Sequence, residues 1–219
     1  NNILKKEINM RAVIYSLILF VCGSVTCVGA AEKLVLEMNM DADLLTLTHH
    51  IDGFPFTPTM NFSPDLAGNL SGRIKVDSLK AHLAVTTLVR IDGEIAGFAT
   101  EQEIVLTDPE TGKPYAESAW LFTLNHPRAS GFLAVKQREN AAPTFALVQQ
   151  VMENPEGKWT DEEHRLLSTD GVTLVQLASG GLSPYLGGRF EEYNFVTQSD
   201  FKKFGRFRAK IVFVIYPKE

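Results

Sequence analysis

Glutamate side chains inside strand-like segments are the residues of this sequence best suited to chemistry. Glu117 is the only acid in the aromatic run of residues 115–124 (YAESAWLFTL). A carboxyl group held inside an apolar barrel loses water, so its pKa rises and it becomes usable as a general acid or base near neutral pH. The sequence therefore predicts Glu117 as the catalytic candidate, with an outward, solvated orientation as the alternative.

A second pair of acids, Glu101 and Glu103, lies two positions apart in another strand-like segment. Because alternate residues of a strand share a face, both side chains point the same way. We expect that face to be the outer, solvated one, and inward placement is the alternative.

Five aromatic side chains are candidates for lining a ligand cavity near Glu117. They are Tyr115, Trp120, Phe122, Tyr193 and Phe213. Aromatic rings fill protein cores as readily as they line pockets, so both interpretations are kept.

Other site chemistries are disfavoured by the spacing of the residues they need. The five histidines show no H-x-H or H-E-x-x-H pattern, and His49 and His50 would point to opposite faces of a strand. No G-x-S-x-G motif occurs, and no Lys-Ser/Thr follows the Gly-Gly pairs at 180–181 and 187–188. We therefore predict no metal and no cofactor, and we interpret the Gly-Gly pairs as turns.

Composition excludes several classes of protein. Of 219 residues, 45% are hydrophobic and 21% are charged, as in ordinary globular proteins. The net charge of −5 argues against a basic nucleic-acid-binding surface. Both cysteines lie within residues 1–30, so residues 31–219 contain none and must be stabilised by core burial.

The first part of the chain has the pattern of a targeting segment. Residues 12–31 carry no charge, follow Met10-Arg11 and end in the small residues VGAA. This is typical of a secretory signal peptide, and we predict cleavage after Ala30. Residues 1–30 are then an upstream extension plus signal peptide, and the protein is secreted or periplasmic. Retention as a membrane anchor, or as a lipoprotein through Cys22 or Cys27, is the alternative.

The remaining residues, 31–219, are predicted to form one domain of short strands. Segments of strand length and pattern occupy residues 33–39, 43–49, 72–77, 81–91, 94–107, 115–124, 130–138, 171–178, 189–197 and 206–216. Turn signals separate them, including Asp92-Gly93 and the cluster at 108–114. We predict an all-β fold, a single antiparallel barrel of about eight strands with one short helix. The last segment is apolar on both faces, which fits an outer contact such as a homo-oligomer interface.

One interval has helical spacing. Residues 144–152 (TFALVQQVM) carry their apolar side chains on one face, between Pro143 and Asn154-Pro155. We predict a short amphipathic helix packed on the barrel. The charged residues 153–170 are expected to form an excursion with a turn of helix at 161–164.

Four segments of the C-terminal half share a pattern of aromatic strands and glycine turns. They are residues 115–124, 130–137, 172–190 with its two Gly-Gly turns, and 211–216. Together they resemble the family of small eight-stranded barrels that contains the allene oxide cyclases and dirigent proteins. The resemblance covers about 100 of the 219 residues, and the insertion at 141–170 departs from it. It implies a hydrophobic cavity and a cyclase or stereochemistry-directing role, neither of which a fold establishes.

Three functions are consistent with these observations. The first is an exported barrel that binds a small hydrophobic molecule in its lumen. The second is an enzyme of the cyclase type that uses a pocket carboxylate, and the third is a structural or interaction barrel with a filled core. An eight-stranded barrel is wide enough either to be filled by side chains or to hold one small ligand. We expect no nucleic-acid partner and, after signal cleavage, no membrane partner.

Overall fold

The computed structural model describes residues 31–40, 42–51, 81–154, 156–200 and 210–219. The predicted signal peptide and the strand expected at 72–77 lie outside the described residues. Lys33–Glu219 forms one compact unit. In the described part of the chain, no helix combines the length and apolar character needed to cross a lipid bilayer.

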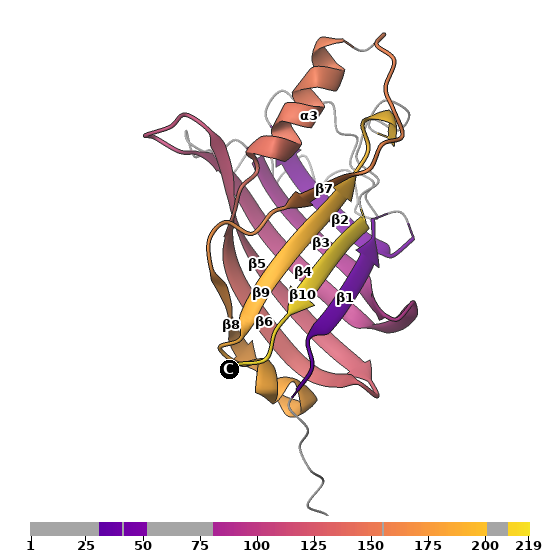
Figure 1. Ribbon diagram of the computed structural model, residues 1–219, viewed down its shortest axis with the longest axis vertical. Coiled ribbons are helices and arrows are strands. Elements are labelled where there is room, and N and C mark those ends of the chain that lie inside the picture. The colour runs from indigo at the N-terminus through magenta and orange to yellow at the C-terminus, as the bar shows by residue number, and fades with distance from the viewer. Residues whose placement is uncertain (1–30, 41, 52–80, 155, 201–209) are drawn as a thin grey trace, which may run out of the picture. The chain divides into compact units, whose positions relative to one another are not determined.

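Ten strands form one antiparallel sheet (Figure 1). They are β1 (Leu34–Asn39), β2 (Leu44–Ile51), β3 (Ala81–Ile91), β4 (Glu94–Thr107), β5 (Pro114–His126), β6 (Ala129–Glu139), β7 (His164–Leu167), β8 (Thr173–Ala178), β9 (Arg189–Val196) and β10 (Lys210–Ile215). The order across the sheet is β1-β10-β9-β8-β6-β5-β4-β3-β2, with β7 also paired to β9. β1 pairs with β3 as well, at Glu37 and Arg90, and this contact closes the sheet.

The closed sheet is the eight-stranded antiparallel barrel that the sequence predicts. β1 and β2 pair with different parts of β3, and β7 and β8 pair with different parts of β9. Each of these two pairs of short strands therefore occupies a single strand position of the wall. The wall therefore runs from neighbour to neighbour in chain order, and β10 returns to β1.

The hairpin between β3 and β4 forms where its sequence signal predicts. Asp92 and Gly93 have φ angles of 52° and 84°. Two successive left-handed residues make the turn type whose twist matches that of antiparallel strands. The turn therefore fixes the register of β3 and β4 at this edge.

Two elements differ from the prediction. The expected turn of helix at residues 161–164 is wrong, because His164 begins β7 and pairs with Val196 of β9. A 3-10 helix, η1 (Gly180–Tyr185), follows β8 and was not expected. A pairing partner distant in the sequence determines β7, and no local pattern contains that information.

The apolar part of the barrel interior is filled by side chains. Its centre is an aromatic cluster, defined as Trp120, Phe122, Phe190 and Phe213, all fully buried. Phe213 packs edge-on against Trp120 and Phe122, with ring centroids 4.8 and 5.0 Å apart. Such aromatic contacts add to the stabilisation from burial. Leu182 and Tyr185 of η1 join the same core.

An ion pair between the buried Asp43 and the partly exposed Arg90 anchors the contact that closes the barrel. The Asp43 carboxylate, between β1 and β2, accepts hydrogen bonds from Nε and Nη2 of Arg90 on β3, at 2.9 and 2.7 Å to Oδ1. The backbone N–H of Asn39 donates to Oδ2 at 3.0 Å. Both the hydrogen bond and the charge of Asp43 raise the pKa of Arg90. The bend between β1 and β2 is thereby held against β3.

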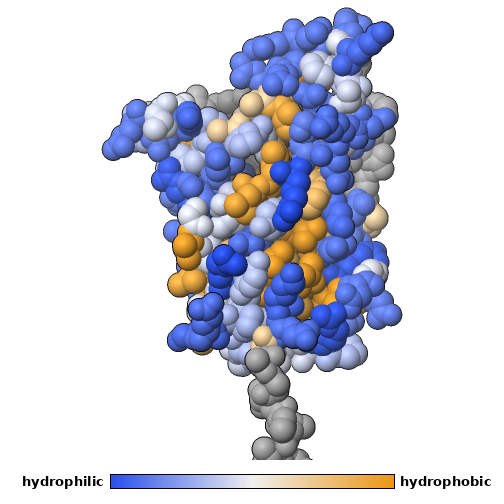
Figure 2. All heavy atoms as spheres, in the orientation of Figure 1, coloured by the Kyte–Doolittle hydropathy of each residue, from blue (hydrophilic) through white to orange (hydrophobic). Residues whose placement is uncertain are grey.

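The outer face of the last strand carries the apolar residues that suggested an oligomer interface. Val212 and Val214 of β10 are half-buried. Apolar side chains gather over the face formed by β9, β10 and β1, and hydrophilic ones surround them (Figure 2). Association through this face stays a prediction.

The predicted helix is present as α3 (Ala142–Glu153), with Pro143 in its first turn. Val151 is buried, and Leu147 is half-buried and packs against the barrel core. These two residues lie one turn apart on one face of the helix. The face that the sequence predicts to be apolar is therefore the one that touches the barrel.

Replacing Leu147 with Asp is expected to lower the free energy of unfolding by about 1–3 kcal/mol, because a charge then replaces an apolar contact with the core. Urea unfolding followed by circular dichroism measures the change. Ala146→Asp, at the neighbouring exposed position, is the matched control and should cost less. Equal stability of the Leu147→Asp and control proteins would place this face of α3 in solvent.

Candidate functional site

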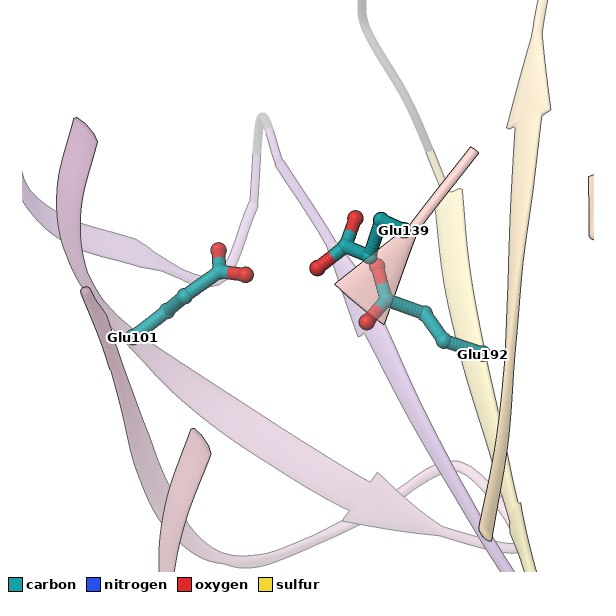
Figure 3. A group of neighbouring side chains, drawn as sticks. All are labelled: Glu101, Glu139 and Glu192. Carbon is teal, nitrogen blue, oxygen red and sulfur yellow. The ribbon is translucent and has the colours of Figure 1, made fainter. Parts of the chain in front are cut away.

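Three glutamate side chains from separate strands converge inside the barrel, at the end where β6 leads into α3. Glu101 on β4, Glu139 on β6 and Glu192 on β9 are 5%, 6% and 2% exposed. One carboxylate oxygen of each lies within 4.8 Å of those of the other two. Figure 3 shows Glu101 reaching across the interior toward Glu139 and Glu192. We call these three residues the acidic cluster.

Strand alternation places the acidic cluster inside. Glu101 follows the buried Ala99 by two positions, and Glu192 follows the buried Phe190 by two positions. Residues two apart in a strand face the same side of the sheet. A carboxylate at these positions therefore points into the barrel, and turning it outward would need a shift in strand register that exposes the core.

Neutral hydrogen-bond donors hold the carboxylates of Glu139 and Glu192, and the Ser118 hydroxyl also lies close enough to Glu101 to lower its pKa. The Gln137 amide donates to Oε1 of Glu139 at 2.9 Å and to Oε2 of Glu192 at 2.5 Å. The Trp120 indole N–H donates to the same Glu192 oxygen at 2.9 Å, and the Ser118 hydroxyl donates to Oε1 of Glu139. One oxygen of Glu139 and one of Glu192 are thus fixed in place.

Gln137 is itself oriented by Thr169. The Thr169 hydroxyl donates to the amide oxygen of Gln137 at 3.1 Å and accepts the backbone N–H of Glu192 at 2.9 Å. Because the oxygen of the Gln137 amide is occupied by this donor, its NH2 group faces the two carboxylates. The arrangement is a connected network rather than a set of isolated contacts.

Glu101 differs from the other members of the cluster. Its Oε1 atom is fully buried and has no hydrogen-bond partner among the described residues. Most buried polar atoms in folded proteins are satisfied, and each exception calls for an explanation such as a bound ion.

The acidic cluster has no cationic partner in the described ranges, because no Lys, Arg or His there forms an ion pair with it. Burial, reinforced by the neighbouring carboxylates, raises the pKa of Glu101 and of Glu192 well above the usual range. Burial also raises the pKa of Glu139. Glu103, half-buried, has its pKa raised to about 8 by burial and by the charge of Glu139. Without a bound cation, the cluster therefore releases its protons at a higher pH than solvent-exposed glutamates do.

The predicted catalytic candidate Glu117 is not part of this cluster. Its side chain lies on the outer face of β5, 43% exposed, with its carboxylate 3.9 Å from Lys136 Nζ. Ala116, Ser118, Trp120 and Phe122 occupy inward positions of β5, so the odd-numbered residues of this strand, Glu117 among them, face out. For Glu101 and Glu103 the prediction of an outer, solvated face is wrong, because both side chains lie on the inward face of β4.

The five predicted cavity aromatics divide between the two faces of the barrel wall. Trp120, Phe122 and Phe213 are inside, and Trp120 contacts the acidic cluster. Tyr115 and Tyr193 are outside the lumen, where guanidinium groups stack on their rings at 4.0 Å from each ring centroid. Those two tyrosines therefore do not line the interior.

A groove of about 510 Å³ opens in the barrel wall between β6 and β8. The two segments pair at Val135 and Val175, and again at Glu139 and Thr169, but separate between these points. Gln137 lies in the groove wall and also holds two members of the acidic cluster. The groove therefore approaches the cluster from the side of the barrel.

Comparison with known proteins gives no relative from which a role could be transferred. No family model, curated protein or solved structure matches this chain. The resemblance to allene oxide cyclases and dirigent proteins stays a prediction, and function has to be argued from the site.

Proposed function

We propose that this protein is a ligand-binding barrel that holds a small ligand at the acidic cluster. The observation that carries the proposal is the fully buried Oε1 of Glu101, which has no hydrogen-bond partner among the described residues and belongs to a side chain directed toward Glu139 and Glu192 (Figure 3). A ligand that supplies positive charge or hydrogen-bond donors would satisfy that atom and reduce repulsion among the carboxylates.

The packing of the interior favours this ligand class over the hydrophobic one expected from the sequence. Phe122 and Phe213 are fully buried against each other, so the aromatic part of the lumen is occupied by the protein's own side chains. The polar end carries the unsatisfied atom. The hydrophobic ligand, the cyclase and the filled structural barrel stay predictions, as does export through residues 1–30.

Trp120 provides a reporter for the test, because its indole N–H bonds to Glu192. Trp159→Phe leaves Trp120 as the only tryptophan of the chain. We expect a cationic probe, Ca²⁺ or spermidine, to change Trp120 fluorescence saturably and to raise the melting temperature. Lauric acid, the apolar probe, should do neither.

Two matched variants locate the response. Glu192→Gln should abolish it, whereas Glu117→Gln, the same change on the outer face, should leave it intact. A saturable response to lauric acid with none to the cations would overturn the proposal in favour of the hydrophobic ligand. So would a cation response that survives Glu192→Gln unchanged.

A further inference from the structure

We infer that the acidic cluster is a binding site for a divalent metal ion of the oxygen-preferring class, with Glu101, Glu139 and Glu192 as its protein ligands. This inference rests on the proposed function and names the ligand. It departs from the sequence prediction of no metal, which considered histidine spacing and not carboxylates from separate strands.

The spacing of the three carboxylates suits one ion. A Ca²⁺ ion binds oxygen at about 2.3–2.6 Å, so two ligands on opposite sides of it are about 4.6–5.2 Å apart and adjacent ligands are closer. The three glutamate oxygens all lie within 4.8 Å of one another. One ion between them can therefore contact all three strands, β4, β6 and β9, without a rearrangement of the wall.

The donor set and its charge select the class of ion. All three donors are carboxylates, which hard cations such as Ca²⁺, Mg²⁺ and Mn²⁺ prefer. Each carboxylate is at least nine-tenths buried, and none forms an ion pair with a cation in the described part of the chain. A divalent ion supplies twice the charge of an organic ammonium group in a smaller volume, which suits a buried site.

The hydrogen bonds around the cluster match those that orient metal ligands. Gln137, Trp120 and Ser118 hold one oxygen of Glu139 and one of Glu192. Outer groups of this kind fix the direction of ligating carboxylates in metal sites. The second oxygen of each remains for the ion.

Glu101 supplies an observation that points to a ligand and does not depend on the closeness of the three carboxylates. It is 5% exposed, its Oε1 has no partner among the residues described, and its side chain is aimed at the other two (Figure 3). A ligating role accounts for a buried oxygen atom that none of the described residues satisfies.

Terbium luminescence tests the inference, because Tb³⁺ substitutes for Ca²⁺ and is excited by energy transfer from a nearby tryptophan. In the Trp159→Phe protein we expect sensitised emission through Trp120 that Ca²⁺ and Mn²⁺ displace, and that strengthens as the pH rises because the ion competes with protons for the carboxylates. Glu101→Gln should weaken Mn²⁺ binding, measured by titration calorimetry, at least about 100-fold. Glu117→Gln should leave it unchanged.

A second variant separates ligation from folding. In the same Trp159→Phe background, Trp120→Phe should abolish the tryptophan-sensitised emission. Mn²⁺ should still bind in titration calorimetry, about 10-fold more weakly because the hydrogen bond from Trp120 to Glu192 is lost. Thermal melting of each metal-free variant verifies that it is folded.

The outcomes distinguish the inference from the proposed function. If spermidine binds in a Glu192-dependent way while Tb³⁺, Mn²⁺ and Ca²⁺ do not bind, the metal inference falls and the proposed function stands. If no cationic probe binds, both fall. Metal binding that is as strong in Glu101→Gln and in Glu139→Gln as in the unsubstituted protein would also overturn the inference, because the ion would then lie elsewhere.

Discussion

Replacing Phe213 with Ala is expected to lower the free energy of unfolding by about 3–5 kcal/mol. The ring is fully buried at the centre of the aromatic cluster. It packs against Trp120, Phe122 and Phe190 with centroid distances of 4.8, 5.0 and 5.7 Å. A hydrogen-bonded wall surrounds these rings on all sides, so the barrel cannot collapse into the space that the ring leaves.

Phe98→Ala on β4 is the matched control, because its ring is on the outer face and 44% exposed. We expect this change to cost less than about 1 kcal/mol. Urea unfolding followed by tryptophan fluorescence measures both variants. Equal losses would contradict the division between filled interior and outer surface on which the placement of the ligand site depends.

Raising the pH from about 5 to 9 is expected to destabilise the metal-free protein by several kcal/mol. In the unfolded chain the glutamates titrate near 4.5, whereas in the folded barrel the pKa of Glu103 is about 8 and those of Glu101 and Glu192 are raised well above the usual range. Between these values the folded state keeps protons that the unfolded state releases. The stabilisation is therefore complete below about pH 4.5 and is lost as the pH rises through the folded-state pKa values.

Melting temperatures in EDTA across this pH range test the prediction. The double variant Glu101→Gln, Glu192→Gln should flatten the profile, and Glu117→Gln should follow the wild type. A saturating divalent ion should oppose the loss at high pH, because it binds the deprotonated carboxylates. Stability that increases with pH in the absence of metal would mean that another positive group already neutralises the cluster.

Much of the fold was readable from the sequence because hairpin barrels depend on local patterns. Strand-length segments separated by turn signals identified β3, β4 and β5, and Asp92-Gly93 gave the turn between β3 and β4. The change to helical spacing identified α3. What local pattern could not supply was β7, which is a strand only because β9 lies beside it.

The site was harder to predict because it depends on which face of each strand turns inward. In β5 the alternation of Ala116, Ser118, Trp120 and Phe122 already marked the inward face, and it excluded Glu117. The apolar neighbours of Glu117 suggested an interior position, although in a strand adjacent residues occupy opposite faces.

For β4 no comparable signal exists, because both faces mix polar and apolar residues. The meeting of Glu101, Glu139 and Glu192 also depends on the closure of the barrel, which brings together residues far apart in the sequence. A single sequence contains no direct record of such contacts.

The pairing of the first strand with the last has a consequence for how the chain folds. All six residues of β1 pair with β10, and only Glu37 of β1 also pairs with β3, at Arg90. During synthesis the meander from β3 to β9 can assemble hairpin by hairpin, but β1 has no complete partner until β10 has been made. Until then β1 and β9 present open edges on which another chain can pair. We expect closure to be a late step, so changes at the Asp43–Arg90 contact should increase aggregation during folding as well as lower the stability of the finished barrel.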